Sequence, residues 1–211
     1  MKKKRLIFLS GFLFTAFILF TFAISFIDVK PIGPMESSVG FAKLNSFFHR
    51  LTGVSLPLYS LTDLLSIIPL SFSFVFALIG LLQWIKRKSI FKVDRNIIFL
   101  GFFYIITLLS FLFFEAVVIN YRPILINGML EASYPSSTTM LVTTIMPTTA
   151  IQVSLRIKNK TVRAFSIALI YLFSYFMVIL RFISGVHWFT DIVGGLLLSS
   201  ALVLMYRSII K

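Results

Sequence analysis

Residues 181–195 read RFISGVHWFTDIVGG and place an arginine, a histidine and an aspartate in a strongly apolar part of the chain. Ionisable side chains are costly inside a membrane, so an intramembrane charge is a candidate functional group. Gly185 predicts a turn between two helices. Asp191 follows His187 by four residues, one helical turn, so the carboxylate is expected to face the imidazole.

The composition indicates a membrane protein. The chain has 211 residues, is 58% hydrophobic and contains 25 phenylalanines. A soluble domain of this length leaves too much of its chain at the water boundary to hide that much apolar surface. The chain has no cysteine, which excludes disulfides and thiolate metal sites.

Six apolar runs are long enough to cross a bilayer, which takes about 20 residues for a ~30 Å hydrocarbon core. We therefore predict an all-α bundle of six transmembrane helices in a single domain, residues 1–211. The first run could be a signal peptide, but its apolar part is long and no A-x-A-like cleavage site follows, which favours a retained helix. The predicted spans are Leu6–Ile27, Leu64–Ile85, Ile97–Ile119, Thr139–Leu155, Ala164–Ile183 and Trp188–Tyr206.

The basic residues predict the orientation of these helices. The net charge is +13, and 15 of the 20 Lys and Arg lie at the two ends of the chain or in every second connection. That is the positive-inside pattern for six helices with both termini in the cytoplasm. The charge is thus a topology signal, and no nucleic-acid partner is expected.

Three segments then face outward. Residues 28–63 form a loop with a short amphipathic piece, VGFAKLNSFFHRL, which we expect to lie as a helix in the interface. Residues 120–138 form a second outer loop that carries part of the site. The third is the turn around Gly185.

These outer segments bring together groups that suit a phosphate. Arg122 and Arg181 supply guanidiniums, which bind phosphate or carboxylate. The hydroxyl run Ser136, Ser137 and Thr138 opens the fourth span, and a helix N-terminus is a ready anion site. Taken singly, the arginines could merely reach the headgroups and the hydroxyls could merely cap the helix.

A histidine held by a carboxylate on one nitrogen is free to attack through the other. His187 and Asp191 fit that description, although a structural polar pair at a helix start is the alternative. Their place on the same outer face as the arginines favours a catalytic site.

The stretch 181–191 resembles the third signature of the type 2 phosphatidic acid phosphatase family. These are membrane phosphatases that share an active site with vanadium haloperoxidases. That signature runs Ser-Arg, five residues, His, three residues, Asp. Arg181, His187 and Asp191 fit the spacing, Gly185 sits where the family commonly has glycine, and Leu180 replaces the serine.

The first two signatures are degraded. YPSST resembles Pro-Ser-Gly-His through Pro135 and Ser136, with Ser137 in place of the glycine, and YRP matches the Arg-Pro end of the first signature. Thr138 stands where the family has the histidine that protonates the leaving group. Glu115 stands where the family has a lysine.

The resemblance implies a six-helix bundle that needs no metal or cofactor. It makes His187 the nucleophile, Asp191 its orienting group, and Arg122, Arg181 and Ser136 the holders of the phosphate oxygens. The expected product of attack is a phosphohistidine intermediate on a lipid phosphate substrate.

The missing acid bears on the substrate. Losing a general acid costs about 10²–10⁴-fold when an alkoxide must leave, whereas a lipid pyrophosphate expels a phosphate that needs no proton. This favours an isoprenoid pyrophosphate of the undecaprenyl type. Glu115 and His49 are possible substitute acids, since burial raises the pKa of a carboxyl group.

Two other functions stay open: an inactive relative that only binds a lipid phosphate, and a lipid transporter, whose polar groups at a helix break would mark a permeation path. The expected location is a bacterial plasma membrane, with the site facing outward. The sequence does not predict an oligomeric state.

Overall fold

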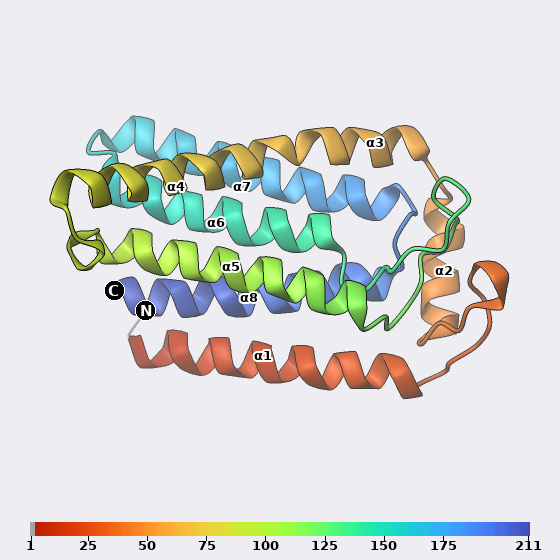
Figure 1. The fold of residues 1–211 in the computed structure, drawn as a ribbon. Coiled ribbons are helices and arrows are strands. Elements are labelled where there is room, and N and C mark those ends of the chain that lie inside the picture. Colours follow the sequence, from red (N-terminus) through yellow and green to blue (C-terminus); the bar gives the residue numbers. More distant parts are fainter. Residues whose placement is uncertain (1–2) are drawn as a thin grey trace.

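The computed structural model describes residues 3–211, and every regular element in that range is a helix. Long helices run alongside one another as a bundle, and one short helix, α2, crosses its end (Figure 1). The prediction of an all-α protein is confirmed. The elements are α1 (Lys3–Phe26), η1 (Pro34–Glu36), α2 (Ala42–Thr52), α3 (Leu56–Leu65), α4 (Ile67–Arg87), η2 (Ile90–Lys92), α5 (Arg95–Ala116), α6 (Ser137–Arg156), α7 (Lys160–Ile183) and α8 (Phe189–Ile210).

Within the described residues, five helices are long and apolar enough to cross a membrane: α1, the continuous α3–α4 segment Leu56–Arg87, α5, α7 and α8. The chain is therefore a multi-pass membrane protein. Helix α6 has the length of a span, 20 residues, but it is rich in threonine and less apolar. A sixth span through α6 remains a prediction.

The polarity of α6 is explained by its place in the bundle, where it packs against α7 and α8. Thr144, Thr148 and Thr149 are almost fully buried. The hydroxyls of Thr148 and Thr149 donate to carbonyl oxygens one turn earlier on the same helix. A hydroxyl satisfied in this way is tolerated away from water.

Helix α8 is the centre of the fold, with α1, α5 and α6 packed on it. Ser10 of α1 donates to the carbonyl oxygen of Ala201 at 2.8 Å, and both residues are buried. In lipid, helices associate through close packing and such polar contacts rather than through the hydrophobic effect. This contact joins α1 to the rest of the bundle, and the retention of α1 in the mature protein stays a prediction.

The second predicted span begins earlier than expected, at Leu56 instead of Leu64. The segment Tyr59–Asp63 contains four polar residues and was expected to be loop, yet Pro57 occupies the first turn of α3, where proline is favoured. Ser66 separates α3 from α4. Pro69 follows three residues later, and a proline there has no N–H for the helix ladder.

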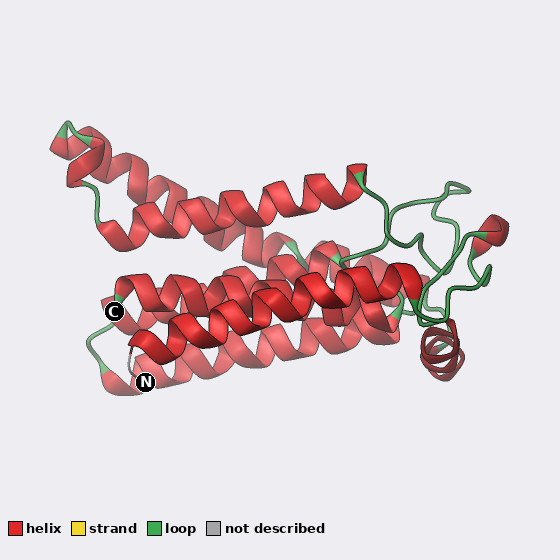
Figure 2. Cartoon of the chain, turned by 90° about the horizontal axis from the view of Figure 1, so that it is seen from below, coloured by secondary structure: helices red, strands yellow, loops and turns green. Residues whose placement is uncertain are grey.

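The amphipathic stretch forms α2, three residues shorter at its start than the predicted piece. Figure 2 shows it as a coil seen nearly end-on, beside the loops at one end of the bundle. Asn45 fastens it to α8: its amide donates to the Thr190 hydroxyl at 3.0 Å, and its side-chain oxygen accepts from the Thr190 N–H at 3.2 Å. The placement of α2 in a membrane interface remains a prediction.

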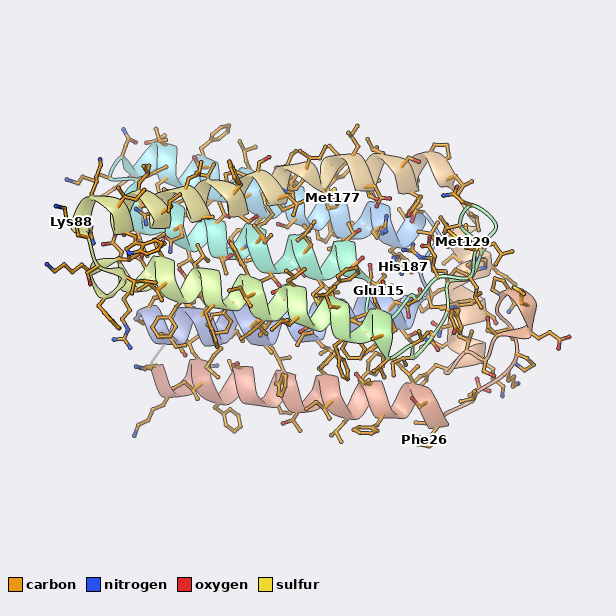
Figure 3. The ribbon with its side chains drawn as sticks, viewed as in Figure 1. Phe26, Lys88, Glu115, Met129, Met177 and His187 are labelled. Atoms are coloured by element: carbon orange, nitrogen blue, oxygen red, sulfur yellow. The ribbon has the colours of Figure 1, made fainter. Side chains whose placement is uncertain are left out.

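The two ends of the bundle differ in chemistry. Lys88 lies at one end, and His187 with Glu115 lies toward the other (Figure 3). The start of α1 and the end of α8 also lie at the Lys88 end (Figure 1). The candidate site and the basic connections are thus on opposite sides, as the charge pattern predicts.

Candidate active site

The segment 120–133 folds back on itself and delivers one arginine to the site. The Ser133 N–H donates to the Asn120 carbonyl at 2.9 Å, and the Arg122 N–H donates to the Glu131 carbonyl at 3.0 Å. Ile126 and Met129 exchange backbone hydrogen bonds nearer the tip. This pairing sets Arg122 beside Glu131 and Ser133 beside Asn120.

The next residues anchor the start of α6 on α8. The Ser136 N–H donates to the Asp191 carbonyl at 3.0 Å. The ring of Tyr134 lies directly on Gly194, where an added Cβ would fall 2.3 Å from a ring carbon. Only glycine allows this approach, so the second motif is seated on the helix that carries Asp191.

His187 stands in the turn between α7 and α8 and is 4% exposed. Gly185 makes this turn with a φ of +66°, and a Cβ there would lie 1.8 Å from the carbonyl oxygen of Gly53. The Trp188 indole donates to the Tyr121 carbonyl at 2.7 Å. The turn is therefore held both by the end of α2 and by the 120–133 segment.

The imidazole contacts a serine and a carboxylate on one nitrogen and an arginine on the other. Nδ1 lies 3.0 Å from the Ser133 hydroxyl and 3.6 Å from Asp191 Oδ2. The Ser133 hydroxyl donates to that same carboxylate oxygen, which also accepts the Trp188 N–H at 2.8 Å. Nε2 faces the Arg122 guanidinium, with 3.5 Å between Nε2 and Nη1.

Both arginines contact carboxylates. Arg181, 2% exposed, donates to Asp63 Oδ1 at 2.8 Å. Arg122 forms an ion pair with Glu131, with 3.1 Å between Nε and Oε2. The Tyr59 ring lies between the two guanidiniums, 4.6 Å from that of Arg181 and 5.6 Å from that of Arg122.

The surroundings of His187 keep its imidazole neutral. Burial lowers the pKa of His187 well below its usual value, and the positive charges of Arg181 and Arg122 lower it further. A neutral imidazole has a lone pair available for attack. The two guanidiniums thus favour a neutral imidazole, and their positive charge would also attract an anion.

Two cavities meet at this point. A small one, about 10 Å³ in volume, reaches His187 and has room for about one water molecule. A larger one, about 670 Å³ in volume, is lined by Arg181, Thr138 and Glu131. Glu115, Arg122 and Ser137 line both cavities, so a shift of these side chains would join them.

A third cavity extends from the site along the bundle. It has a volume of about 540 Å³ and lies between α4, α5 and α6, with mostly apolar walls such as Leu70, Leu108 and Leu141. It shares Asp63, Phe111, Ser137 and Thr138 with the larger site cavity. The 670 Å³ cavity is thus a polar chamber, and the 540 Å³ cavity is an apolar groove joined to it.

The structure brings together most of the predicted site residues, with two exceptions. Ser136 is fully buried and its hydroxyl accepts from Thr139, so it does not line the cavities around His187. His49 lies against the Trp188 ring, 5.4 Å between centroids, and likewise does not line them. Of the two possible substitute acids, only Glu115 shares a cavity with His187.

The comparisons with known proteins bear on this geometry. Residues 115–211 match the family model of the PAP2 superfamily, a region that begins near the end of α5 and includes α6, α7 and α8. This matched region contains Arg122, Arg181, His187 and Asp191. This confirms the resemblance of the stretch 181–191 to the type 2 phosphatidic acid phosphatases.

The fold of the chain is also found among solved structures. The crystal structure of the first transmembrane PAP2 type phosphatidylglycerolphosphate phosphatase from Bacillus subtilis superposes with a TM-score of 0.64, covering 94% of this chain and 93% of that chain. The two sequences are 16% identical, so the likeness concerns the fold. No protein of curated function is similar enough in sequence to count as a match.

Sequence reasoning missed three residues of this candidate site: Asp63, Glu131 and Ser133. One signal could have found the first two, because the chain has only seven acidic residues and these two lie in outer segments. Nothing in the sequence marks Ser133, because its place opposite Asn120 depends on the pairing of the 120–133 segment.

Proposed function

We propose that this chain is a lipid phosphatase of the PAP2 superfamily in which His187 takes the phosphoryl group. The observation that carries the proposal is the environment of Nε2, which faces Arg122 and a cavity while Nδ1 is held from behind. Phosphoryl transfer requires mainly positioning and charge neutralisation. A neutral nucleophile beside two guanidiniums meets both requirements.

The reaction proceeds in two steps. The Nε2 lone pair attacks phosphorus, the bond from phosphorus to the leaving oxygen breaks, and a phosphohistidine forms. Water then hydrolyses the phosphorus–nitrogen bond and releases phosphate. Arg122, Arg181 and the first N–H groups of α6 at Ser137 and Thr138 neutralise the charge on the phosphoryl oxygens.

The substrate we propose is an isoprenoid pyrophosphate of the undecaprenyl type or a related lipid phosphate. Thr138 cannot protonate a leaving alkoxide, whereas the phosphate that leaves a pyrophosphate needs no proton. For monoesters, Glu115 is the acid that we propose, because it lines the same cavity as His187. The apolar groove of about 540 Å³ beside the polar chamber suits the hydrocarbon tail.

We place the enzyme in a bacterial plasma membrane with six spans, α6 included, and both termini in the cytoplasm. The end that carries His187 then faces outward, and α2 lies along the outer interface. The support is the separation of the basic connections from the site. The proposed mechanism uses side chains and backbone N–H groups of this chain, and we propose that it needs no metal.

An inactive lipid-phosphate-binding relative is the second candidate. It is favoured by one observation: both arginines already contact carboxylates, Asp63 and Glu131, in the substrate-free site. In that case the chain would bind a lipid phosphate weakly and would not turn it over.

The test is phosphate release by the purified protein in detergent. The substrates are undecaprenyl pyrophosphate, phosphatidic acid and phosphatidylglycerolphosphate, each with and without EDTA. We expect release from the pyrophosphate that persists in EDTA, is lost in His187→Ala and is kept in His49→Ala. A folded protein that releases phosphate from none of them contradicts the enzyme and leaves the binding role.

A further inference from the structure

We propose that Ser133 is a positioning residue that links Asp191 to His187 and selects the imidazole tautomer able to attack. This inference rests on the proposed function and deepens it. It assigns the orienting contact to a serine hydroxyl from the 120–133 segment, where the sequence predicted direct contact between the carboxylate and the imidazole.

The distances show that the carboxylate does not reach the imidazole by itself. His187 Nδ1 and Asp191 Oδ2 are 3.6 Å apart, too far for a hydrogen bond, which requires about 2.7–3.2 Å. The Ser133 hydroxyl lies between them, 3.0 Å from Nδ1 and hydrogen-bonded to Oδ2. All three side chains are almost fully buried, so water does not compete for these contacts.

The single proton of the hydroxyl decides the tautomer. An ionised carboxylate only accepts hydrogen bonds, so the Ser133 hydroxyl donates its hydrogen bond to Asp191. The oxygen of Ser133 can then only accept from Nδ1, which must carry the imidazole proton. Nε2 is left with its lone pair and faces Arg122 and the cavity.

The serine is itself held in place. Its N–H donates to the Asn120 carbonyl at 2.9 Å, and the next residue, Tyr134, is seated on Gly194. The carboxylate cannot easily close the gap, because Asp191 Oδ2 also accepts the Trp188 N–H. Loss of the hydroxyl would therefore leave Nδ1 without a partner.

The arrangement also suits the charge that develops in the reaction. As the bond forms between Nε2 and phosphorus, the ring becomes cationic while its proton stays on Nδ1. The hydrogen bond from Nδ1 to Ser133 strengthens, and the Asp191 charge acts through the polarised hydroxyl. The phosphohistidine is stabilised without a net transfer of a proton to the serine.

The kinetic test uses Ser133→Ala and Ser133→Thr with undecaprenyl pyrophosphate. We expect Ser133→Ala to lower kcat by about 10- to 100-fold with little change in KM, since the lost hydrogen bond becomes charged only during attack. Ser133→Thr, which keeps a hydroxyl, should recover much of kcat. The control is Ser10→Ala, which removes an equally buried hydroxyl from the α1–α8 contact.

The tautomer is measured separately by ¹⁵N NMR of the protein in detergent. His49 and His187 are the only histidines, so a His49→Gln background isolates the His187 ring. We expect a protonated Nδ1 and a bare Nε2, and in Ser133→Ala a mixture of tautomers. The NMR measurement does not depend on turnover. The tautomer of His187 can be measured in the protein that keeps Ser133, even if the alanine variant does not fold.

The outcomes separate the two proposals. A protein that turns over no lipid while its His187 shows the expected tautomer overturns the enzyme and keeps the role of Ser133 in orienting the ring. A protein in which the proton resides on Nε2, or in which Ser133→Ala keeps full kcat, overturns the role of Ser133 and leaves the enzyme standing.

Discussion

The two carboxylates that contact the arginines should weaken substrate binding, and Glu131→Gln tests this. In the substrate-free site Arg122 Nε lies 3.1 Å from Glu131 Oε2, in the same cavity that must receive the phosphate. The Glu131 carboxylate and a phosphate therefore compete for the Arg122 guanidinium, and the ion pair with Glu131 must break before the phosphate can bind it fully. The amide keeps the size of the side chain and removes the charge.

The size of the effect follows from the geometry. Two unit charges about 4 Å apart attract by about 4 kcal/mol at the effective dielectric constant of ~20 found near protein surfaces. Solvation and side-chain ordering offset most of this, and exposed pairs contribute about 0.2–1 kcal/mol. The Arg122 side chain is only 9% exposed, but that of Glu131 is 34% exposed. We therefore expect about 1–2 kcal/mol, which is roughly a 5- to 30-fold lower KM.

The assay is steady-state phosphate release from undecaprenyl pyrophosphate by Glu131→Gln. We expect KM to fall with kcat nearly unchanged, and the gain to shrink at high salt because screening weakens the original ion pair. Glu36→Gln is the matched control, since it removes an exposed charge from η1. An unchanged or higher KM in Glu131→Gln refutes the reasoning, because Glu131 would then position Arg122 rather than compete for it.

Three further predictions concern packing, protonation and the missing acid. Gly194→Ala should lower both the thermal stability and the activity, because the added Cβ would lie 2.3 Å from the Tyr134 ring. The control is Gly11→Ala, where the added Cβ has no atom within 4 Å and should leave both the thermal melt and the phosphate assay unchanged. The imidazole of His187 should titrate by NMR well below pH 6.5. The free energy of unfolding should fall as the pH drops below 6.5, because the unfolded chain then binds the proton more readily than the folded chain. A His187 titration near pH 6.5 would contradict the argument that burial and the two arginines lower its pKa. Thr138→His should raise the rate of phosphatidic acid cleavage by about 10- to 100-fold relative to pyrophosphate cleavage by restoring a general acid, and equal effects on both substrates would contradict the leaving-group argument.

Much of the fold could be predicted because the bilayer sets the length of each helix. The third helix was predicted over Ile97–Ile119 and runs over Arg95–Ala116, and the fifth was predicted over Ala164–Ile183 and runs over Lys160–Ile183. The start of the second was missed because polar residues suggested a loop. That helix turns its polar residues toward the site, where Asp63 contacts Arg181.

The site could be predicted in outline because the topology forces the ends of three segments to one side of the bundle. Arg122, Arg181 and His187 do meet there. The finer contacts depend on tertiary register, which no periodicity in the sequence records. Ser133 reaches His187 only because residues 131–133 pair with residues 120–122.

His49 shows the limit of reasoning from residue type alone. A histidine on the outer side was a reasonable candidate acid, but the helix that carries it presents the ring to Trp188. Burial lowers the pKa of His49, opposed by its contact with the Gly185 backbone. Its place behind the turn suits packing rather than proton transfer to a substrate.

The central claim is that His187 receives the phosphoryl group, and rapid-quench trapping tests it most directly. Undecaprenyl pyrophosphate labelled with ³²P on its terminal phosphate is mixed with the protein, quenched within milliseconds and digested for peptide mapping. The account predicts an acid-labile, base-stable label on the peptide that contains His187, and no label in His187→Ala. Phosphate release without any labelled protein, or a label that survives in His187→Ala, would contradict it.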